Sequence, residues 1–165
     1  MVTRDSTTGS VIPAPAPRLF HGIDLGRVEE AIRTAERQTS SEIRVAIART
    51  YFWGDITRAA KRVFSRLRMD RTAARNGVLL FVAPRRHRFA LWGDAAVDHK
   101  VTQKVWDEVA AVIGADFRRG QLTDGIVRGV QALGERLASI FPFNPKVDRN
   151  ELPDQVVLPG QTPRS

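Results

Sequence analysis

Two apolar runs joined by a short turn constrain the fold of this chain more than any other feature. The run Val78–Ala83 is apolar at every position, the segment Pro84–His87 turns the chain, and Arg88–Asp94 follows with apolar residues at alternate positions. A strand that is apolar on both faces is typical of the centre of a sheet covered by helices, and the turn predicts an antiparallel neighbour. A third strand is predicted upstream, at Glu42–Ala48, and we expect it to run parallel to the central one.

Four stretches with apolar residues at helical spacing surround these strands. The first begins after Asp24, a favourable N-cap residue, and the second spans residues 56–68. The third is predicted over residues 97–113, ended by Gly114, and the last over residues 123–140. The order helix, strand, helix, strand, strand, helix, helix predicts an α/β protein, a three-layer α/β/α sandwich with a mixed sheet and helices on both faces.

The predicted domain covers residues 21–141. Residues 1–20 are rich in Thr, Ser, Pro and Ala, so we expect a flexible leader. Residues 142–165 carry five prolines and are expected to form a tail that packs only in part. The tail residues expected to pack on the domain are Leu152, Val156 and Val157.

Composition narrows the class of protein. The chain has 165 residues, enough for one domain with a core, and no cysteine, which excludes disulfides and thiolate metal sites. It has no run of apolar residues long enough to cross a bilayer and no secretory signal pattern, so we expect a cytoplasmic protein that does not insert into membranes. The net charge of +8 permits attraction to anionic partners without choosing among them, and a solvated basic surface is the favoured explanation of it.

Polar residues collect at one predicted rim of the sheet. Because the turn reverses the chain, Asp94 should lie near Asn76, and a parallel first strand brings Glu42 to the same place. The candidate rim residues are Glu42, Asp70, Arg75, Asn76, Asp94 and Asp98, with His99 close by. Oxygen ligands from Glu42, Asp94 and Asp98 would suit calcium or magnesium. The structural alternative is that Asn76 and Gly77 form a tight strand entry and that Asp94 and Asp98 cap a helix.

A second candidate lies at the opposite end of the strands. Three consecutive aromatic residues, Tyr51, Phe52 and Trp53, follow the first strand, and Arg85 and Arg86 lie in the turn at the same edge. Aromatic and Arg side chains together favour contact with a partner protein, or stacking on single-stranded bases. The alternative is that an aromatic residue of the loop packs the second helix onto the sheet.

The remaining motifs argue against several common functions. The second helix has a basic face that a solvated helix would show anyway: Arg58, Lys61, Arg62 and Arg66. The three histidines lie far apart, and the chain has no Walker A sequence, dinucleotide fingerprint or nucleophile elbow. Without a helix-turn-helix, RNA-recognition or zinc pattern, we do not expect a nucleic-acid partner.

Several short motifs resemble one known family. Residues 39–45, TSSEIRV, resemble the T-x-x-E-I-x-V opening strand of the TPM domain, and residues 76–80, NGVLL, are similar to its N-G-V-L-L signature. Residues 117–120 with Gly125 and Ile126 resemble its F-x-x-G…G-I stretch before the last helix. The endings Phe141-Pro142 and residues 150–153 are similar to one branch of the family, so the resemblance covers about residues 20–158.

The resemblance implies a Rossmann-like fold without a dinucleotide loop. Plant members in the thylakoid lumen are linked to photosystem II repair and to acid phosphatase activity, an animal member is an accessory subunit of a receptor channel, and some bacterial members bind calcium. Most members are exported and membrane-anchored. This chain departs from the family at residues 92–97, WGDAAV, where many members carry V-G-x-G-L-E-G in a loop of their polar site.

We therefore expect a TPM-domain binding or accessory module with a protein partner. It would be a monomer and would require no cofactor. The enzymatic alternative is a weak metal-assisted acid phosphatase at the rim of Glu42, Asn76 and Asp94. The third hypothesis is a polyanion-binding protein.

Overall fold

The computed structural model describes residues 18–49 and 54–161. In chain order the elements are β1 (Leu19–Phe20), β2 (Ile23–Asp24), α1 (Leu25–Glu36), β3 (Ile43–Ile47), α2 (Ile56–Arg66), the 3-10 turn η1 (Met69–Arg71), β4 (Val78–Ala83), the 3-10 turn η2 (Pro84–Arg86), β5 (Arg88–Gly93), α3 (Ala95–Lys100), α4 (Gln103–Arg118) and α5 (Leu122–Ile140). Most of the predicted leader, residues 1–17, lies outside the described residues, but Leu19–Phe20 at its end pairs with β2 as a short hairpin.

The main sheet has the order β3-β4-β5. Strand β3 runs parallel to β4, with Ile43 opposite Val78, and β5 runs antiparallel to β4, with Gly93 opposite Val78. Both strand pairings predicted from the sequence are therefore confirmed. Because β4 lies in the centre, β5 forms one edge of the sheet and β3 the other.

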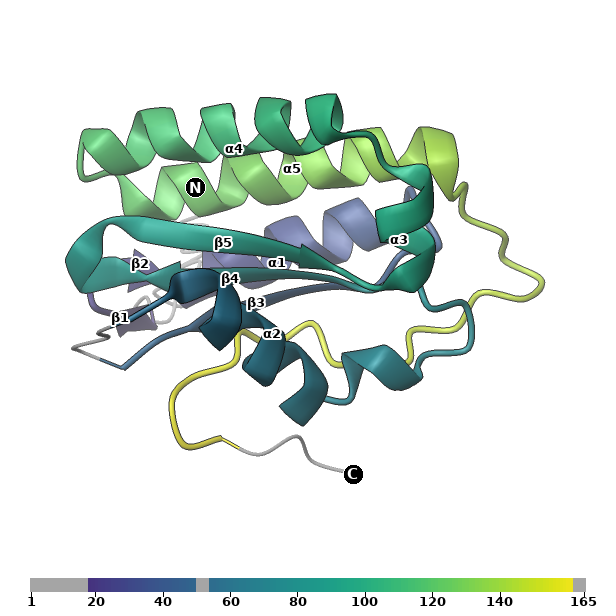
Figure 1. Ribbon diagram of the computed structural model, residues 1–165, viewed down its shortest axis with the longest axis horizontal. Helices are drawn as coiled ribbons and strands as arrows, with labels where there is room; N and C mark the ends of the chain where they lie inside the picture. The colour runs from purple at the N-terminus through teal and green to yellow at the C-terminus, as the bar shows by residue number, and fades with distance from the viewer. Residues whose placement is uncertain (1–17, 50–53, 162–165) are drawn as a thin grey trace, which may run out of the picture.

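The sheet separates two layers of helices, as Figure 1 shows: α1, α4 and α5 cover one face, and α2 covers the other. Each face of the sheet has its own hydrophobic core, and the side chains of β4 point alternately into one and the other, because successive side chains of a strand point to opposite faces. Val78, Leu80 and Val82 join the core under α1, α4 and α5. Leu79 and Phe81 join the core under α2. The three-layer α/β/α sandwich with a mixed sheet is confirmed.

Helix α5 packs closely on both neighbouring helices of its layer. A Cβ atom at Gly129 would lie 2.4 Å from Ile113 of α4, and one at Gly134 would lie 2.7 Å from the Cβ of Ala35 in α1. At Gly134 the facing atoms are the Cβ and main chain of Ala35, so any larger residue would push the two helices apart. At Gly129 a larger residue would require the Ile113 side chain to move.

The third helix was predicted incorrectly. In place of one helix over residues 97–113, the chain forms α3 and α4, separated by extended residues at Val101 and Thr102. Helix α4 continues through Gly114 to Arg118 because Phe117, in its last turn, is buried, and this burial outweighs the weak helix propensity of glycine. Among the described helices, none combines the length and the apolar character needed to span a bilayer.

The C-terminal segment, residues 142–161, returns along the outer edge of β3 (Figure 1). The Val157 amide donates to the Val45 carbonyl at 2.9 Å, and the Ile47 amide donates to the Val157 carbonyl at 2.9 Å. Val156 and Val157 are buried, and Leu152 packs against the core under α2. This segment therefore covers the β3 edge, whereas no described segment pairs with β5 on its outer side.

Candidate functional site

The rim residues Glu42, Asn76 and Asp94 lie at the same end of the sheet, as predicted. The Val78 amide donates to the Glu42 carbonyl at 2.8 Å, and the Asp94 amide donates to the Gly77 carbonyl at 2.9 Å. Glu42, Asn76 and Asp94 are all buried at the end of the sheet where β3 and β4 begin and β5 ends. The reversal of the β4–β5 hairpin brings them together, as the sequence predicted.

Asp94 is fully engaged at this rim. Its carboxylate accepts hydrogen bonds from Arg75 Nε at 2.7 Å and Arg75 Nη2 at 2.8 Å, and it also accepts one from the Ala95 amide at 2.7 Å. The hydrogen bond to this carboxylate raises the pKa of Arg75. Asp94 therefore serves as the N-cap of α3 and holds Arg75 in a two-point ion pair.

The other rim residues have separate surroundings. Asn76 Nδ2 donates to the Ser40 carbonyl at 3.0 Å and so fastens the start of β4 to the loop before β3. Asp70 lies in η1, and Asp98 and His99 are exposed on α3. Within residues 18–49 and 54–161, no three His, Cys, Asp or Glu side chains are arranged so that they could hold a metal ion, which includes the predicted set of Glu42, Asp94 and Asp98.

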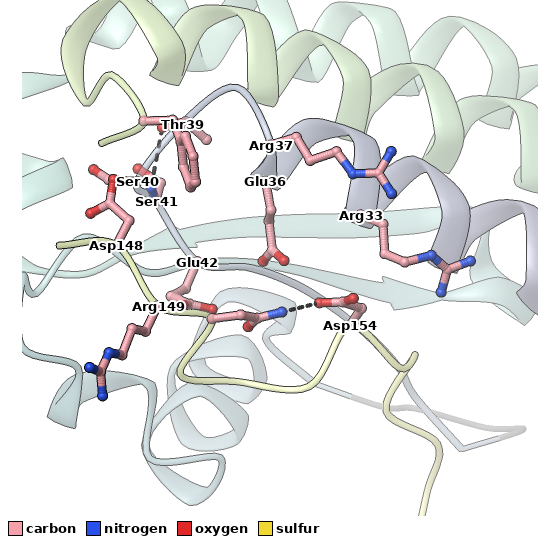
Figure 2. A pocket seen from close by; sticks show the side chains of 12 residues that line it. Arg33, Glu36, Arg37, Thr39, Ser40, Ser41, Glu42, Asp148, Arg149 and Asp154 are labelled. Atoms are coloured by element: carbon pink, nitrogen blue, oxygen red, sulfur yellow. Dashed lines mark hydrogen bonds between the residues drawn. The ribbon is translucent and has the colours of Figure 1, made fainter. Parts of the chain in front are cut away.

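Glu42 instead faces a pocket of about 320 Å³ between the end of α1, the loop before β3 and the C-terminal segment (Figure 2). Its Oε1 accepts a hydrogen bond from the Glu151 amide at 2.8 Å. Its Oε2 is buried and has no hydrogen-bond partner within the described part of the chain. Burial raises the pKa of Glu42 to about 7, so the carboxyl group titrates near neutral pH.

Three further carboxyl groups line this pocket beside Glu42, namely Glu36, Asp148 and Asp154 (Figure 2), and none of them is a site residue predicted from the sequence. Glu36 Oε1 accepts a hydrogen bond from the Ile43 amide at 2.8 Å. Burial, together with a hydrogen bond to the Asp154 carboxyl group, raises the pKa of Glu36 to about 9. Glu36 is therefore protonated at neutral pH. No local motif marks it, because its neighbour Asp154 comes from the predicted tail.

Arg44 lies beside these carboxyl groups on β3. It is buried, and its Nε and Nη1 atoms have no hydrogen-bond partner among the described residues. Burial lowers the pKa of Arg44, and the neighbouring carboxyl groups offset this only in part. We call Glu36, Glu42, Arg44 and Asp154 the acid–Arg cluster. It joins α1, β3 and the C-terminal segment, so its evident role is to hold that segment in place.

A larger groove of about 690 Å³ follows β5, the sheet edge with which no other described segment pairs on its outer side. Every residue from Phe89 to Asp94 lines it, although alternate residues of a strand point to opposite faces. It is therefore a groove along the strand edge itself. One wall comes from Thr57 of α2, and the other comes from four residues of α4: Gln103, Trp106, Asp107 and Ala110. We call this feature the β5 groove.

The predicted partner edge is only partly described. Tyr51, Phe52 and Trp53 lie outside the described residues. Arg85 is exposed in η2, and Arg86 Nη1 donates to the Gly54 carbonyl at 3.3 Å, which connects η2 to the loop before α2. The partner edge therefore stays a prediction.

The basic face of α2 is present as predicted. Arg58, Lys61, Arg62 and Arg66 are not in the buried set of the helix, which consists of Ile56, Ala59, Ala60 and Phe64. Lys61 Nζ lies 5.7 Å from the ring centroid of Trp92, close to the β5 groove. This helix face is exposed to solvent, which both a polyanion site and a merely solvated basic face would require, so exposure does not distinguish the two.

Comparisons with known proteins agree with this fold. The TPM domain matches residues 16–136. The NMR structure of the BA42 protein from the psychrophilic bacterium Bizionia argentinensis is similar, with 34% sequence identity and a TM-score of 0.76 over 81% of this chain and 91% of that one. The N-terminal domain of the cg2496 protein from Corynebacterium glutamicum shares the fold, with 10% identity and a TM-score of 0.53 over 84% of this chain and 80% of that one. No curated protein matches the sequence.

Proposed function

The chain belongs to the TPM domain family, and we propose that it serves as a binding module that takes a segment of a partner polypeptide in the β5 groove. One observation carries this proposal: a sheet edge that no described segment covers borders a groove with two tryptophans in its lining.

The lining has the composition of a protein-binding surface. Trp92 and Trp106 are half-buried, so each presents part of its ring to the groove. Buried or half-buried tryptophan is enriched among the residues that dominate binding energy at protein interfaces. The opposite edge of the same sheet is covered by the C-terminal segment, so the two edges differ in what they offer to a partner.

The rival hypotheses have less support from the site. For a metal-assisted phosphatase, Asp94 and Arg75 would have to act on substrate, yet they are bonded to each other. A Glu42 carboxyl group with a pKa near 7 would suit proton transfer, but it bonds the C-terminal segment. Polyanion binding stays a prediction on the exposed face of α2, which a steep loss of affinity with salt would support.

A displayed library of random twelve-residue peptides, selected on the full chain, tests the proposed function. The diagnostic variant is Ala110→Arg, which places a long side chain in the groove. Its matched control is Ala111→Arg, the same change at the next position of α4, where the side chain is exposed and outside the groove lining.

We expect peptides selected on the natural chain to bind the Ala111→Arg control and to lose binding to Ala110→Arg by about tenfold or more, since an arginine side chain in the groove would displace peptide contacts worth about 1.4 kcal/mol or more. Failure to enrich any peptide, or equal binding to both variants, would contradict the proposed function.

A further inference from the structure

Along β5, residues whose main-chain N–H and C=O groups bond to β4 alternate with residues whose groups point away from β4. The Asp94 amide donates to the Gly77 carbonyl, which marks this pair as a hydrogen-bonded pair of the antiparallel ladder. Because such pairs alternate with non-bonded ones, Trp92 and Ala90 direct their N–H and C=O groups toward β4. Phe89, Leu91 and Gly93 direct theirs away from the sheet, into the β5 groove.

The outward groups have no partner strand. The described residues form no pairing on the outer side of β5, and the sheet ends there. Natural proteins usually blunt such an edge with charged residues, proline or a covering segment, because an open edge accepts another strand. From Phe89 to Gly93 this edge carries no charge and no proline. Its open length is therefore suited to main-chain pairing.

The charged side chains that line the groove favour a basic partner. The chain carries a net charge of +8, yet the charged side chains in the groove lining are all acidic: Asp94, Asp98 and Asp107. Asp94 is paired with Arg75. Asp98 and Asp107 are exposed, and Asp107 also accepts a hydrogen bond from Gln103 Nε2 at 2.9 Å. Lys61 of α2 lies next to the groove, with its Nζ over the ring of Trp92. A second copy of this chain would bring the same two aspartates against themselves, which is unfavourable. A segment with Lys or Arg would complement them.

Resting on the proposed function, we infer that the β5 groove binds an extended, basic segment of a partner protein as a fourth strand of the sheet. The main chain of that segment pairs with Phe89, Leu91 and Gly93. Its apolar side chains contact the tryptophans of the groove, and its Lys or Arg side chains lie beside Asp98 and Asp107. Main-chain bonds supply affinity and the side-chain contacts supply specificity, as in other cases of strand addition.

Amide hydrogen exchange of the full chain, with and without a selected peptide, tests the pairing. We expect the amides of Phe89, Leu91 and Gly93 to exchange at least about tenfold more slowly in the complex, since each gains a main-chain hydrogen bond. The amides of Ala90 and Trp92, already bonded to β4, should change much less. This alternation distinguishes strand addition from simple shielding of the groove, which would slow neighbouring amides alike.

Charge reversal tests the basic character of the partner. Asp107→Lys should weaken a Lys- or Arg-containing peptide by about fivefold, because an attraction becomes a repulsion. Changing the basic residues of the same peptide to Glu should restore affinity for Asp107→Lys and lower it for the natural chain. Recovery through the swapped peptide also shows that the variant is folded.

The outcomes separate this inference from the proposed function. Peptides that depend on Ala110 but leave the exchange of Leu91 and Gly93 unchanged would overturn strand addition and keep the binding module. Selected peptides without basic residues, or with no response to Asp107→Lys, would overturn the stated partner chemistry. A dimer of this chain that Ala110→Arg disrupts would show a second copy as the occupant and would also overturn it. If no peptide depends on Ala110, both proposals fail.

Discussion

Replacing Glu36 by glutamine should remove a pH-dependent loss of stability. The native pKa of Glu36 is about 9, against an ordinary value of 4.5 that we assign to the unfolded chain. Between these values the native state holds one proton that the unfolded state has released. The free energy of unfolding therefore falls as the pH rises, and the loss is complete only above pH 9. Glutamine imitates the protonated carboxyl group at every pH.

The magnitude follows from the shift. One pKa unit corresponds to about 1.4 kcal/mol, so a fully buried group would lower the stability by about 2.7 kcal/mol between pH 6 and pH 8. Part of the Glu36 side chain is open to the pocket, and water there stabilises the charged form. We therefore expect the natural chain to lose about 1 to 2 kcal/mol more than Glu36→Gln over this range.

Urea unfolding followed by tryptophan fluorescence at pH 6, 7 and 8 measures this difference. The matched control is Glu30→Gln, on the same helix, because Glu30 is exposed and pairing with Arg33 lowers its pKa. Its titration is complete below pH 6, so this control should follow the natural chain. Glu42, with a pKa of about 7, also titrates in this range. It is present in all three proteins, so its contribution to the pH dependence of stability largely cancels in the comparison. If the free energy of unfolding changes with pH equally in the natural chain and in Glu36→Gln, the assignment of a protonated Glu36 is refuted.

Three further changes test the packing. Asp94→Ala should cost about 2 to 4 kcal/mol in urea unfolding, since the α3 cap and a two-point ion pair are lost together; no change would mean that Asp94 has no structural role. Gly134→Ala should destabilise by about 1 to 2 kcal/mol because its methyl group would lie 2.7 Å from a facing Cβ, whereas Gly114→Ala, with no contact closer than 3.7 Å, should stabilise by about 0.5 to 1 kcal/mol. Val157→Asp should destabilise by about 2 kcal/mol or more and speed amide exchange at Ile47, whose N–H donates to residue 157; unchanged exchange would argue against pairing of the C-terminal segment with β3.

Much of the fold could be predicted because burial leaves a periodic record in the sequence. The uninterrupted apolar run of β4 indicates a strand covered on both faces, and the alternation of β5 matches its two cores. The hairpin between them also placed Asp94 beside the start of β4. The helix over residues 97–113 failed because periodicity does not register the extended residues at Val101 and Thr102, or the burial of Phe117 beyond Gly114.

The candidate site was less predictable, because its partners lie far apart in the chain. The sequence brought Glu42 and Asp94 to one rim, but it did not show that Asp94 is bonded to Arg75. Nor did it connect Glu36 with Asp154, which meet only because the C-terminal segment returns along β3. Pairings of this kind depend on the path of the folded chain, which no local pattern records.

Local periodicity and composition are enough to specify the layers of this protein, the direction of its strands and its net basic charge. Which edge of the sheet the described residues leave without a partner depends instead on contacts between distant parts of the chain. The C-terminal segment could in principle cover either outer strand, and it pairs with β3 through Val157. Among the described residues, Phe89, Leu91 and Gly93 therefore keep outward main-chain groups without a partner strand, beside the groove in which we place the partner.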